Sequence, residues 1–452
     1  MVRNLIDILF LLSLLTATAT SASLIDDDVY ATIARFQEYL RINTSHPLPD
    51  YATSTRFLLA QAASIGLHAE TLEFVAGKPI VFLSWAGLRP SLPSILLNSH
   101  TDVVPAEHHK WHHPPFSAST DAAGKIFARG SQDMKCVGAQ YLEAIRLLKA
   151  KGFTPDRTIH LSFLPDEEIG GHAGAEAFAK SSKFQELNVG VVLDEGLAST
   201  GQDYRVFNAE RSPWWIVIRA RGAPGHGARM YDGTAMENLF KSLEVIRRFR
   251  TSQFDLVKSG RKAEGEVVSV NMVFLRAGSP SSTSQTGFVM NVQPSEAEAG
   301  LDIRVPSNAD TGALERRIAE EWAPSSRNMS FELQQFHSKV PVHDMFGKPA
   351  ITTADFSNPW WTLFKEGVKK ANGRLGNPEV FPASTDARYF RFLGIPAFGF
   401  SPMANTPVLL HDHNEFLNKD EYLKGIAIYE SIIREFATYG GPVNHGESSA
   451  EL

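Results

Sequence analysis

The run Ile95-Leu96-Leu97-Asn98-Ser99-His100-Thr101-Asp102 places a short apolar segment directly before a histidine and an aspartate. Similar apolar runs, and stretches with helical apolar spacing between several of them, recur along the chain. The runs span residues 80–85, 159–164, 189–193 and 397–400, and the helical stretches span residues 29–40, 54–65, 134–150 and 173–184. Strands that alternate with helices predict an α/β domain with a mostly parallel sheet covered by helices.

The middle of the chain, residues 209–326, follows a different pattern. In order, it predicts a strand (214–219), a helix (235–249), a polar loop (251–266), strands (267–275, 288–292 and 297–305) and a helix (311–322). This order predicts a small α+β domain inserted into the larger one. We therefore expect the larger domain in two parts, residues 23–208 and 327–440, with its sheet resuming near Phe331, and a C-terminal tail over residues 441–452.

Composition excludes several classes of protein. The 452 residues are 43% hydrophobic and 21% charged, as in ordinary globular proteins, which argues against fibrous and wholly disordered chains. A net charge of −6 argues against broad nucleic-acid binding. The single cysteine, Cys136, excludes an intrachain disulfide framework and any multi-cysteine metal site.

The N-terminus has the pattern of a signal peptide. Arg3 precedes an apolar segment over residues 5–15, and Ala17-Thr18-Ala19 resembles a cleavage site. We expect cleavage of residues 1–22 and a place in the secretory pathway, in the endoplasmic reticulum lumen, a vacuole or outside the cell. An uncleaved anchor is the alternative, although the segment is shorter than the ~20 residues that span a membrane. Glycosylation sequons begin at Asn43 and Asn328, and no later segment is long enough to span a membrane.

Polar side chains follow the ends of several predicted strands. His100 and Asp102 follow the first strand quoted above, and a further acid, Asp133, opens a predicted helix. The other candidates are Glu167 and Glu168 after residues 159–164, Asp194 and Glu195 after residues 189–193, and His411 and His413 beyond residues 397–400. Ligands of open α/β sheets bind at the carboxyl ends of strands, so we expect these groups to converge.

Two imidazoles and at least three carboxylates, without thiolates, suit zinc or another divalent transition metal. A single catalytic zinc usually takes three protein ligands, so five ligands indicate a two-metal site with one bridging carboxylate. Glu167 and Glu168 would point to opposite sides of an extended backbone, so that one binds metal while the other acts as a general base. Asp102 could accept the second ring N–H of His100 or otherwise steady the site.

Each residue alone also has an ordinary interpretation. His100 could be a surface or core histidine, Glu167-Glu168 a solvated helix start, Asp133 a helix N-cap, and Asp194 and Glu195 turn residues. We interpret the histidine-rich run of residues 108–113 as a loop, and Cys136 as a packing residue. Only the combination of these groups favours a metal site.

Four segments resemble the M20 family of dinuclear-zinc amidohydrolases and exopeptidases. They are Ser99-His100-Thr101-Asp102-Val103-Val104-Pro105, Arg129-Gly130-Ser131-Gln132-Asp133-Met134-Lys135, Pro165-Asp166-Glu167-Glu168-Ile169-Gly170-Gly171 and Leu193-Asp194-Glu195-Gly196. Longer stretches are similar to the aminoacylase branch of the family, among them Gln140-Tyr141-Leu142-Glu143-Ala144 and Thr406-Pro407-Val408-Leu409-Leu410-His411-Asp412-His413. The similarity spans residues 28–439.

The resemblance implies a role for each residue that matches a motif. One zinc ion would be held by His100, Asp133 and Glu195, and a second by Asp133, Glu168 and His411, with Asp133 bridging. Glu167 would be the general base and Asp102 the supporting carboxylate. His413 competes with His411, which we prefer because its spacing to Glu415 matches the family.

The inserted domain resembles the lid and dimerisation domain of the family. His226 matches a histidine that reaches the partner subunit's active site, where it would stabilise the oxyanion. Asn291 and Arg304 match positions near the substrate, and Arg388 is a candidate to hold its α-carboxylate. Surface ion pairs are an equal alternative for Arg304 and Arg388.

The activity implied is hydrolysis of N-acyl-L-amino acids, such as N-acetyl-methionine, to a carboxylate and a free amino acid. A metal-bridging water activated by Glu167 would attack the amide in a homodimer that carries two zinc ions, or another divalent metal, per subunit. A dipeptidase or carboxypeptidase on the same scaffold and a non-catalytic dimeric binding protein are the alternatives. One departure is the leader, because the aminoacylases are largely cytosolic.

Overall fold

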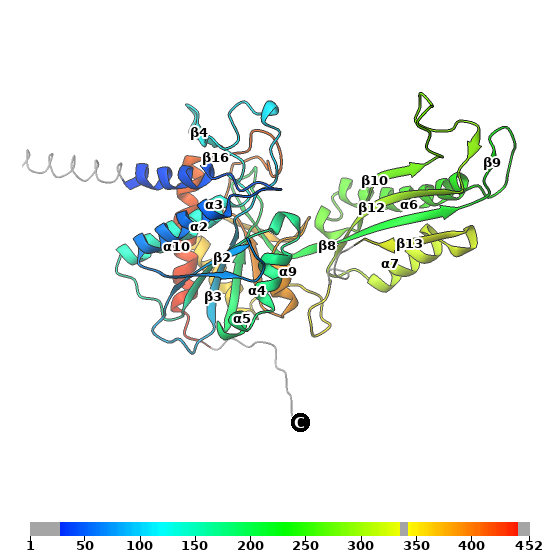
Figure 1. The fold of residues 1–452 in the computed structure, drawn as a ribbon. Helices are drawn as coiled ribbons and strands as arrows, with labels where there is room; N and C mark the ends of the chain where they lie inside the picture. Colours follow the sequence, from blue (N-terminus) through cyan, green and yellow to red (C-terminus); the bar gives the residue numbers. More distant parts are fainter. Residues whose placement is uncertain (1–27, 335–341, 442–452) are drawn as a thin grey trace, which may run out of the picture. The chain divides into compact units, whose positions relative to one another are not determined.

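The computed structural model describes residues 28–334 and 342–441. These residues form two compact units (Figure 1). Unit 1 comprises the described residues up to Arg205, Asn358–Gly376 and the described residues from Phe400 onward, and unit 2 comprises Val206–Ser357 and Asn377–Gly399. The expected signal peptide and almost all of the expected tail lie outside the described residues.

Unit 1 is built around strands in the order β1-β2-β6-β3-β7. The strands β6, β3 and β7 are parallel, whereas β1, β2 and β6 pair antiparallel. Their bounds are β1 His68–Glu73, β2 Pro79–Trp85, β3 Ser94–His100, β6 Ile159–Leu164 and β7 Val189–Asp194. Every residue of β3, β6 and β7 is buried, as expected for central strands covered on both faces. The predicted α/β class is confirmed, with a mixed sheet.

Helices cover this sheet. The helix α10 packs against α3 and α8, while α3 packs on β3 and against α2. The bounds are residues 28–41, α2 Tyr51–Ile65, α3 Lys135–Ala150, α4 Ala177–Ala179, α5 Ser182–Glu186, α8 Pro359–Lys370 and α10 Lys419–Thr438. A small antiparallel sheet combines β4 Ser119–Thr120, β5 Lys125–Phe127 and β16 Phe416–Asn418.

The helix expected over residues 173–184 is broken. A π-turn over His172–Glu176 leads into α4, and α5 starts afresh after Ser181. The hydroxyl of Ser181 accepts a hydrogen bond from the N–H of Phe184, so this side chain caps a new helix instead of continuing the old one.

Unit 2 has an antiparallel sheet in the order β8-β12-β10, with β13 and β14 also paired to β8. Buried apolar residues form one core between the sheet, α6 and the helical residues 311–322, among them Ile218, Leu239, Leu301 and Trp322. The bounds are β8 Tyr204–Arg221, β9 Gly225–His226, α6 Ala235–Lys258, β10 Ser269–Ala277, β11 Val292–Gln293, β12 Glu296–Pro306, α7 Thr311–Arg317, β13 Met329–Leu333, β14 Leu375–Phe381, α9 Ala387–Phe392 and β15 Ala397–Phe400.

Three expectations for this region were wrong. The strand expected over residues 288–292 is mostly turn and irregular backbone, and only Val292 belongs to a strand, β11. The polar stretch that starts at Thr251 does not begin a loop, because α6 continues to Lys258, stabilised by contacts within the helix such as the Arg250 guanidinium over the Phe254 ring. The sheet of unit 1 does not resume at Phe331, which lies in β13 and pairs with Ile218 of β8 in unit 2. Strand pairing between distant segments is not encoded in local periodicity.

Within the described ranges, none of the helices has both the length and the apolar character needed to cross a membrane.

Candidate metal centre

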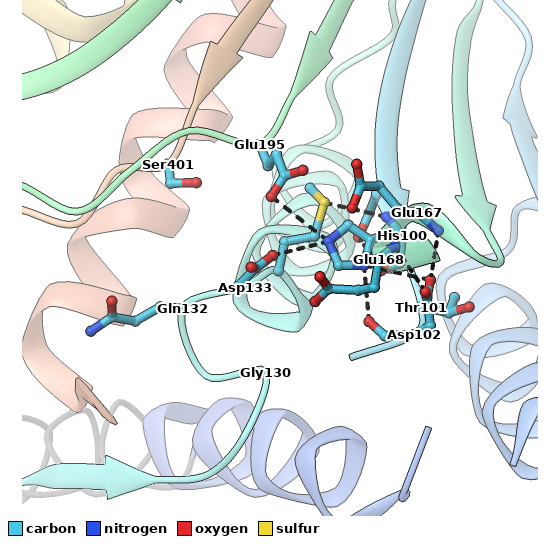
Figure 2. Close-up of polar contacts among 12 residues, drawn as sticks. His100, Thr101, Asp102, Gly130, Gln132, Asp133, Glu167, Glu168, Glu195 and Ser401 are labelled. Atoms are coloured by element: carbon cyan, nitrogen blue, oxygen red, sulfur yellow. Dashed lines mark hydrogen bonds and ion pairs between the residues drawn. The ribbon is translucent and has the colours of Figure 1, made fainter. Parts of the chain in front are cut away.

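The parallel strands of unit 1 deliver most of the site. His100 is the last residue of β3, Glu195 directly follows β7, and Glu167 and Glu168 lie in a 3-10 turn after β6. Asp133 lies just before α3, and His411 comes from the segment between β15 and β16. Because β6, β3 and β7 run parallel, their carboxyl ends meet at one edge, and the side chains that follow them converge there as the sequence predicts. Figure 2 shows this for His100, Glu168 and Glu195.

One group of candidate ligands consists of His100, Asp133 and Glu195. Figure 2 shows their side chains pointing toward one another. His100 Nε2 lies 3.0 Å from Asp133 Oδ1 and 3.7 Å from Glu195 Oε2. One ligand atom from each residue lies within 4.8 Å of the others, and all three residues are buried.

A second group consists of Asp133, Glu168 and His411. His411 Nε2 lies 3.2 Å from Asp133 Oδ2 and 3.1 Å from Glu168 Oε2. Asp133 belongs to both groups, with one carboxylate oxygen facing each histidine. This is the arrangement expected of a carboxylate that bridges two metal ions.

The electrostatics of the site suit divalent cations. Burial, followed by the nearby charge of Asp133, raises the pKa of the Glu195 and Glu168 carboxyls. Hydrogen bonds to Asp133 and Glu168 raise the pKa of His411 to about 10. Three crowded carboxylates thus require positive charge, which protonated imidazoles supply when no metal does. Glu168 Oε1 is buried and accepts no hydrogen bond from the described residues, so it is available as a ligand. The nitrogen and oxygen donors fit zinc or a similar divalent metal.

Asp102 steadies the site in a way that the sequence did not indicate. The Nδ1 of His100 pairs with the main-chain oxygen of Asp102 at 2.9 Å, whereas the nearer carboxylate oxygen of Asp102 is 3.7 Å away. That carboxylate instead accepts the backbone N–H groups of Glu167 and Glu168, at 3.2 and 3.1 Å. The expectation of an extended backbone at Glu167-Glu168 was wrong, because the preceding Asp166 has a φ of 66° and starts the turn.

Two residues outside the predicted set hold the loop before α3. The Glu415 carboxylate accepts hydrogen bonds from the side chain of Arg129 (2.7 Å) and the backbone N–H of Gln132 (2.7 Å). The side chain of Gln132 in turn donates to the main-chain oxygens of Pro407 and Phe416. These contacts tie the segment that bears Asp133 to the segment that bears His411. In the sequence, only its spacing from His411 distinguished Glu415, and Gln132 lay in a segment that resembles the family but had no role assigned to it.

The competing candidates lie elsewhere. His413 Nε2 is 3.4 Å from the exposed Glu107, and His413 belongs to neither ligand group. The histidine-rich run contributes an exposed 3-10 turn, His108–Lys110, and likewise supplies no ligand to either group. Cys136 is buried, with its thiol donating to the main-chain oxygen of Gln132, in agreement with a packing role.

The remaining candidate residues belong to unit 2. His226 and Asn291 lie side by side, because β9 and β11 pair and the N–H of Gly227 donates to the main-chain oxygen of Asn291. Arg304 forms an ion pair with Asp302 at 2.8 Å, which matches the alternative stated for it. Arg388 donates to the main-chain oxygen of Thr385 at 2.6 Å.

Residues 96–435 match the family described as Peptidase family M20/M25/M40. This chain belongs to that family. It is 46% identical over 414 residues to aminoacylase-1 of Dictyostelium discoideum, covering 90% of this chain and 98% of the relative. It is 44% identical over 420 residues to aminoacylase-1 of Mus musculus, covering 93% and 98%.

The fold also resembles that of a solved family member. The YXEP protein of Bacillus subtilis, described as a dinuclear metal binding peptidase from the M20 family, has a TM-score of 0.60 to this chain at 16% identity. The similarity covers 90% of this chain and 99% of that one. At this identity the likeness concerns the fold alone.

Proposed function

We propose that this chain is a zinc-dependent aminoacylase, which hydrolyses N-acyl-L-amino acids such as N-acetyl-methionine. The observation that carries the proposal is the pair of ligand groups that share Asp133, with Glu167 in the same turn as Glu168. Full-length similarity to proteins named aminoacylase-1 supports the choice of substrate over the peptides cleaved by other family members.

In this proposal His100, Asp133, Glu168, Glu195 and His411 hold two zinc ions. When bound, the zinc ions act as Lewis acids that polarise the amide carbonyl and promote deprotonation of water. Glu167 accepts a proton from the attacking water as the new C–O bond forms. It then delivers that proton to the leaving nitrogen as the C–N bond breaks, which gives a carboxylate and a free amine.

His226 is the proposed donor to the oxyanion. Its Nδ1 accepts a hydrogen bond from the N–H of Ala228 at 3.1 Å. A neutral ring in this state carries its proton on Nε2, and that N–H is then the donor. Asn291, Arg304 and Arg388 are proposed to contact the substrate.

The test of this function measures metal content and hydrolysis of acetyl-methionine together, with and without a chelator. About two zinc ions per chain and chelator-sensitive release of methionine are expected. Release of amino acids from dipeptides but not from acetyl-methionine would establish the dipeptidase instead. A protein with neither metal nor activity would favour the binding-protein alternative.

We also propose a homodimer formed through unit 2. In the strand order β8-β12-β10, β10 is the last strand, and it exposes 54% of Met272, 62% of Val273 and 50% of Leu275. Exposed apolar edge strands favour pairing with another chain. Val273→Lys should convert the dimer to a monomer in sedimentation, whereas Val75→Lys, at an exposed apolar position of unit 1, should not. A wild-type protein that sediments as a monomer would refute the dimer.

For location, we propose the secretory pathway. The leader supports it, and Asn43 and Asn328 of the two sequons are both exposed in the folded chain. Expression in a eukaryotic secretory host should yield a protein that a glycosidase shifts to lower mass. Asn43→Gln and Asn328→Gln should remove one step each, and retention of an uncleaved, unglycosylated chain in the cytosol would exclude this route.

A further inference from the structure

A histidine outside the metal ligands contacts the supporting carboxylate. His46 Nε2 lies 2.9 Å from Asp102 Oδ2. The same oxygen accepts the N–H of Glu168, and the other oxygen accepts the N–H of Glu167. The Asp102 side chain is fully buried, and that of His46 is 11% exposed. One carboxylate therefore joins His46 to the backbone of both the general base and a metal ligand.

Hydrogen bonds hold the segment that carries His46 beside the segment that carries Asp102. The N–H of His46 donates to the main-chain oxygen of Val103 at 3.2 Å, and the N–H of Val103 donates to that of Thr44 at 3.1 Å. The hydroxyl of Thr44 also donates to the main-chain oxygen of Thr101 at 2.6 Å. Hydrogen bonds thus join residues 44–46 to Thr101 and Val103, which lie on either side of Asp102. The imidazole is held beside this carboxylate by contacts that do not involve the metal ligands.

We propose that His46 is a positioning residue, whose Nε2–H donates to Asp102 and thereby fixes the turn that presents Glu167 and Glu168. A buried carboxylate is held strongly only while its oxygens receive well-directed donors. Without the His46 donor, Asp102 can rotate, and its bonds to the two N–H groups of the turn then lengthen. Groups behind a metal site act in this way, and their loss typically reduces metal affinity or activity by about 10–100-fold.

The second anchor of the turn is independent of His46. The Asp166 carboxylate accepts the hydroxyl of Tyr51 at 2.7 Å and the ammonium of Lys78 at 2.6 Å. This anchor keeps the turn folded when His46 is replaced. Loss of His46 is therefore expected to misplace the Glu167 and Glu168 carboxylates slightly, without unfolding unit 1.

The test compares His46→Leu with His46→Gln in the full-length protein. Leucine removes the donor, whereas the glutamine side-chain amide can place an N–H near the position of His46 Nε2. For His46→Leu we expect kcat on acetyl-methionine to fall about 10–100-fold at saturating zinc with KM nearly unchanged, and zinc affinity in chelator competition to fall about 10-fold. His46→Gln should restore both to within about three-fold of wild type. His68→Leu, at an exposed position of β1, is the matched control and should behave as wild type.

Wild-type kcat and zinc affinity in His46→Leu would overturn the proposal. Equal defects in the leucine and glutamine variants would also overturn it, because the N–H donor would then not be the cause. The inference on catalysis rests on the proposed function. If the wild type hydrolyses no N-acyl amino acid, that function fails, and the zinc affinities of the three variants still decide whether His46 positions Glu168.

Discussion

The backbone N–H of Asp133 donates a hydrogen bond to Glu415 Oε1 across 3.3 Å. The same carboxylate receives the N–H groups of Gln132 and Gly130 and the guanidinium of Arg129. Glu415 is fully buried, so all of its bonding capacity is used within the protein. The orientation of the shared ligand Asp133 thus depends on a residue that lies close in sequence to His411.

Glu415→Gln should weaken the metal site. The side-chain amide of glutamine would replace one acceptor oxygen with an NH₂ group, and this donor would face the backbone N–H donors of the loop. Loss of one acceptor oxygen should reduce zinc affinity or kcat by about 10–100-fold. Chelator competition and steady-state kinetics check this, with Glu186→Gln on the exposed end of α5 as control. Unaltered zinc affinity and kcat in Glu415→Gln would show that the loop bearing Asp133 keeps its conformation without the Glu415 carboxylate.

His411→Ala should remove one of the two metals. With a metal bound in place of its ring proton, the imidazole would be the nitrogen donor of the second group, which would otherwise contain only Asp133 and Glu168. We expect about one zinc ion per chain after dialysis and a fall in kcat of at least about 100-fold. His413→Ala is the matched control, since His413 pairs with exposed Glu107. Loss of metal from His413→Ala, but not from His411→Ala, would reverse the assignment.

Those features of the fold that depend on local pattern could be predicted from the sequence. The buried strands that end at His100, Leu164 and Asp194 are recognisable in the sequence as apolar runs. The residues after them could therefore be expected to converge. A supporting role for Asp102 could be predicted, but its contacts could not, because they are made to the backbone N–H groups of a 3-10 turn that no residue pattern reveals.

Pairing across long sequence separations limits prediction in the same way. The segment at Phe331 has an ordinary strand pattern, and only its partner, Ile218, assigns it to unit 2. Likewise, Gln132 acts through hydrogen bonds to Pro407 and Phe416, which are more than 250 residues away. Such contacts exist only after the fold has formed.

The lowered pKa of His160 should make part of the free energy of unfolding sensitive to acid. The residue is buried in β6, where Ser84 Oγ pairs with its Nδ1 at 2.8 Å. Burial, followed by the charge of Lys183, lowers the pKa of His160 from 6.5 to about 4. The unfolded chain therefore takes up a proton at a higher pH than the folded one. The contribution of His160 to the free energy of unfolding is complete above pH 6.5 and is lost as the pH falls through 4. At pH 5 the free energy of unfolding has already fallen by about 2 kcal/mol.

Urea unfolding at pH 7.5 and pH 5 checks this contribution. His160→Gln keeps a partner for Ser84 but does not titrate, so it should lose about 2 kcal/mol less than wild type between these pH values. Both proteins share every other titrating group, so the difference isolates His160. His68→Gln, which is exposed, should follow wild type, and equal losses in His160→Gln and wild type would contradict the prediction.

Glu167→Gln should separate metal binding from catalysis. Glu167 belongs to neither ligand group, whereas its neighbour Glu168 belongs to the second, so the amide should leave both metals in place. The backbone N–H of residue 167 would still donate to Asp102, since the change affects only the side chain. An amide cannot accept and return the proton of the attacking water, and we expect kcat to fall about 10²–10⁴-fold with little change in KM. Zinc analysis and acetyl-methionine kinetics on the same preparation measure both quantities, with Glu186→Gln again as control. Turnover close to wild type would remove Glu167 as the general base, and loss of zinc would make it a ligand instead.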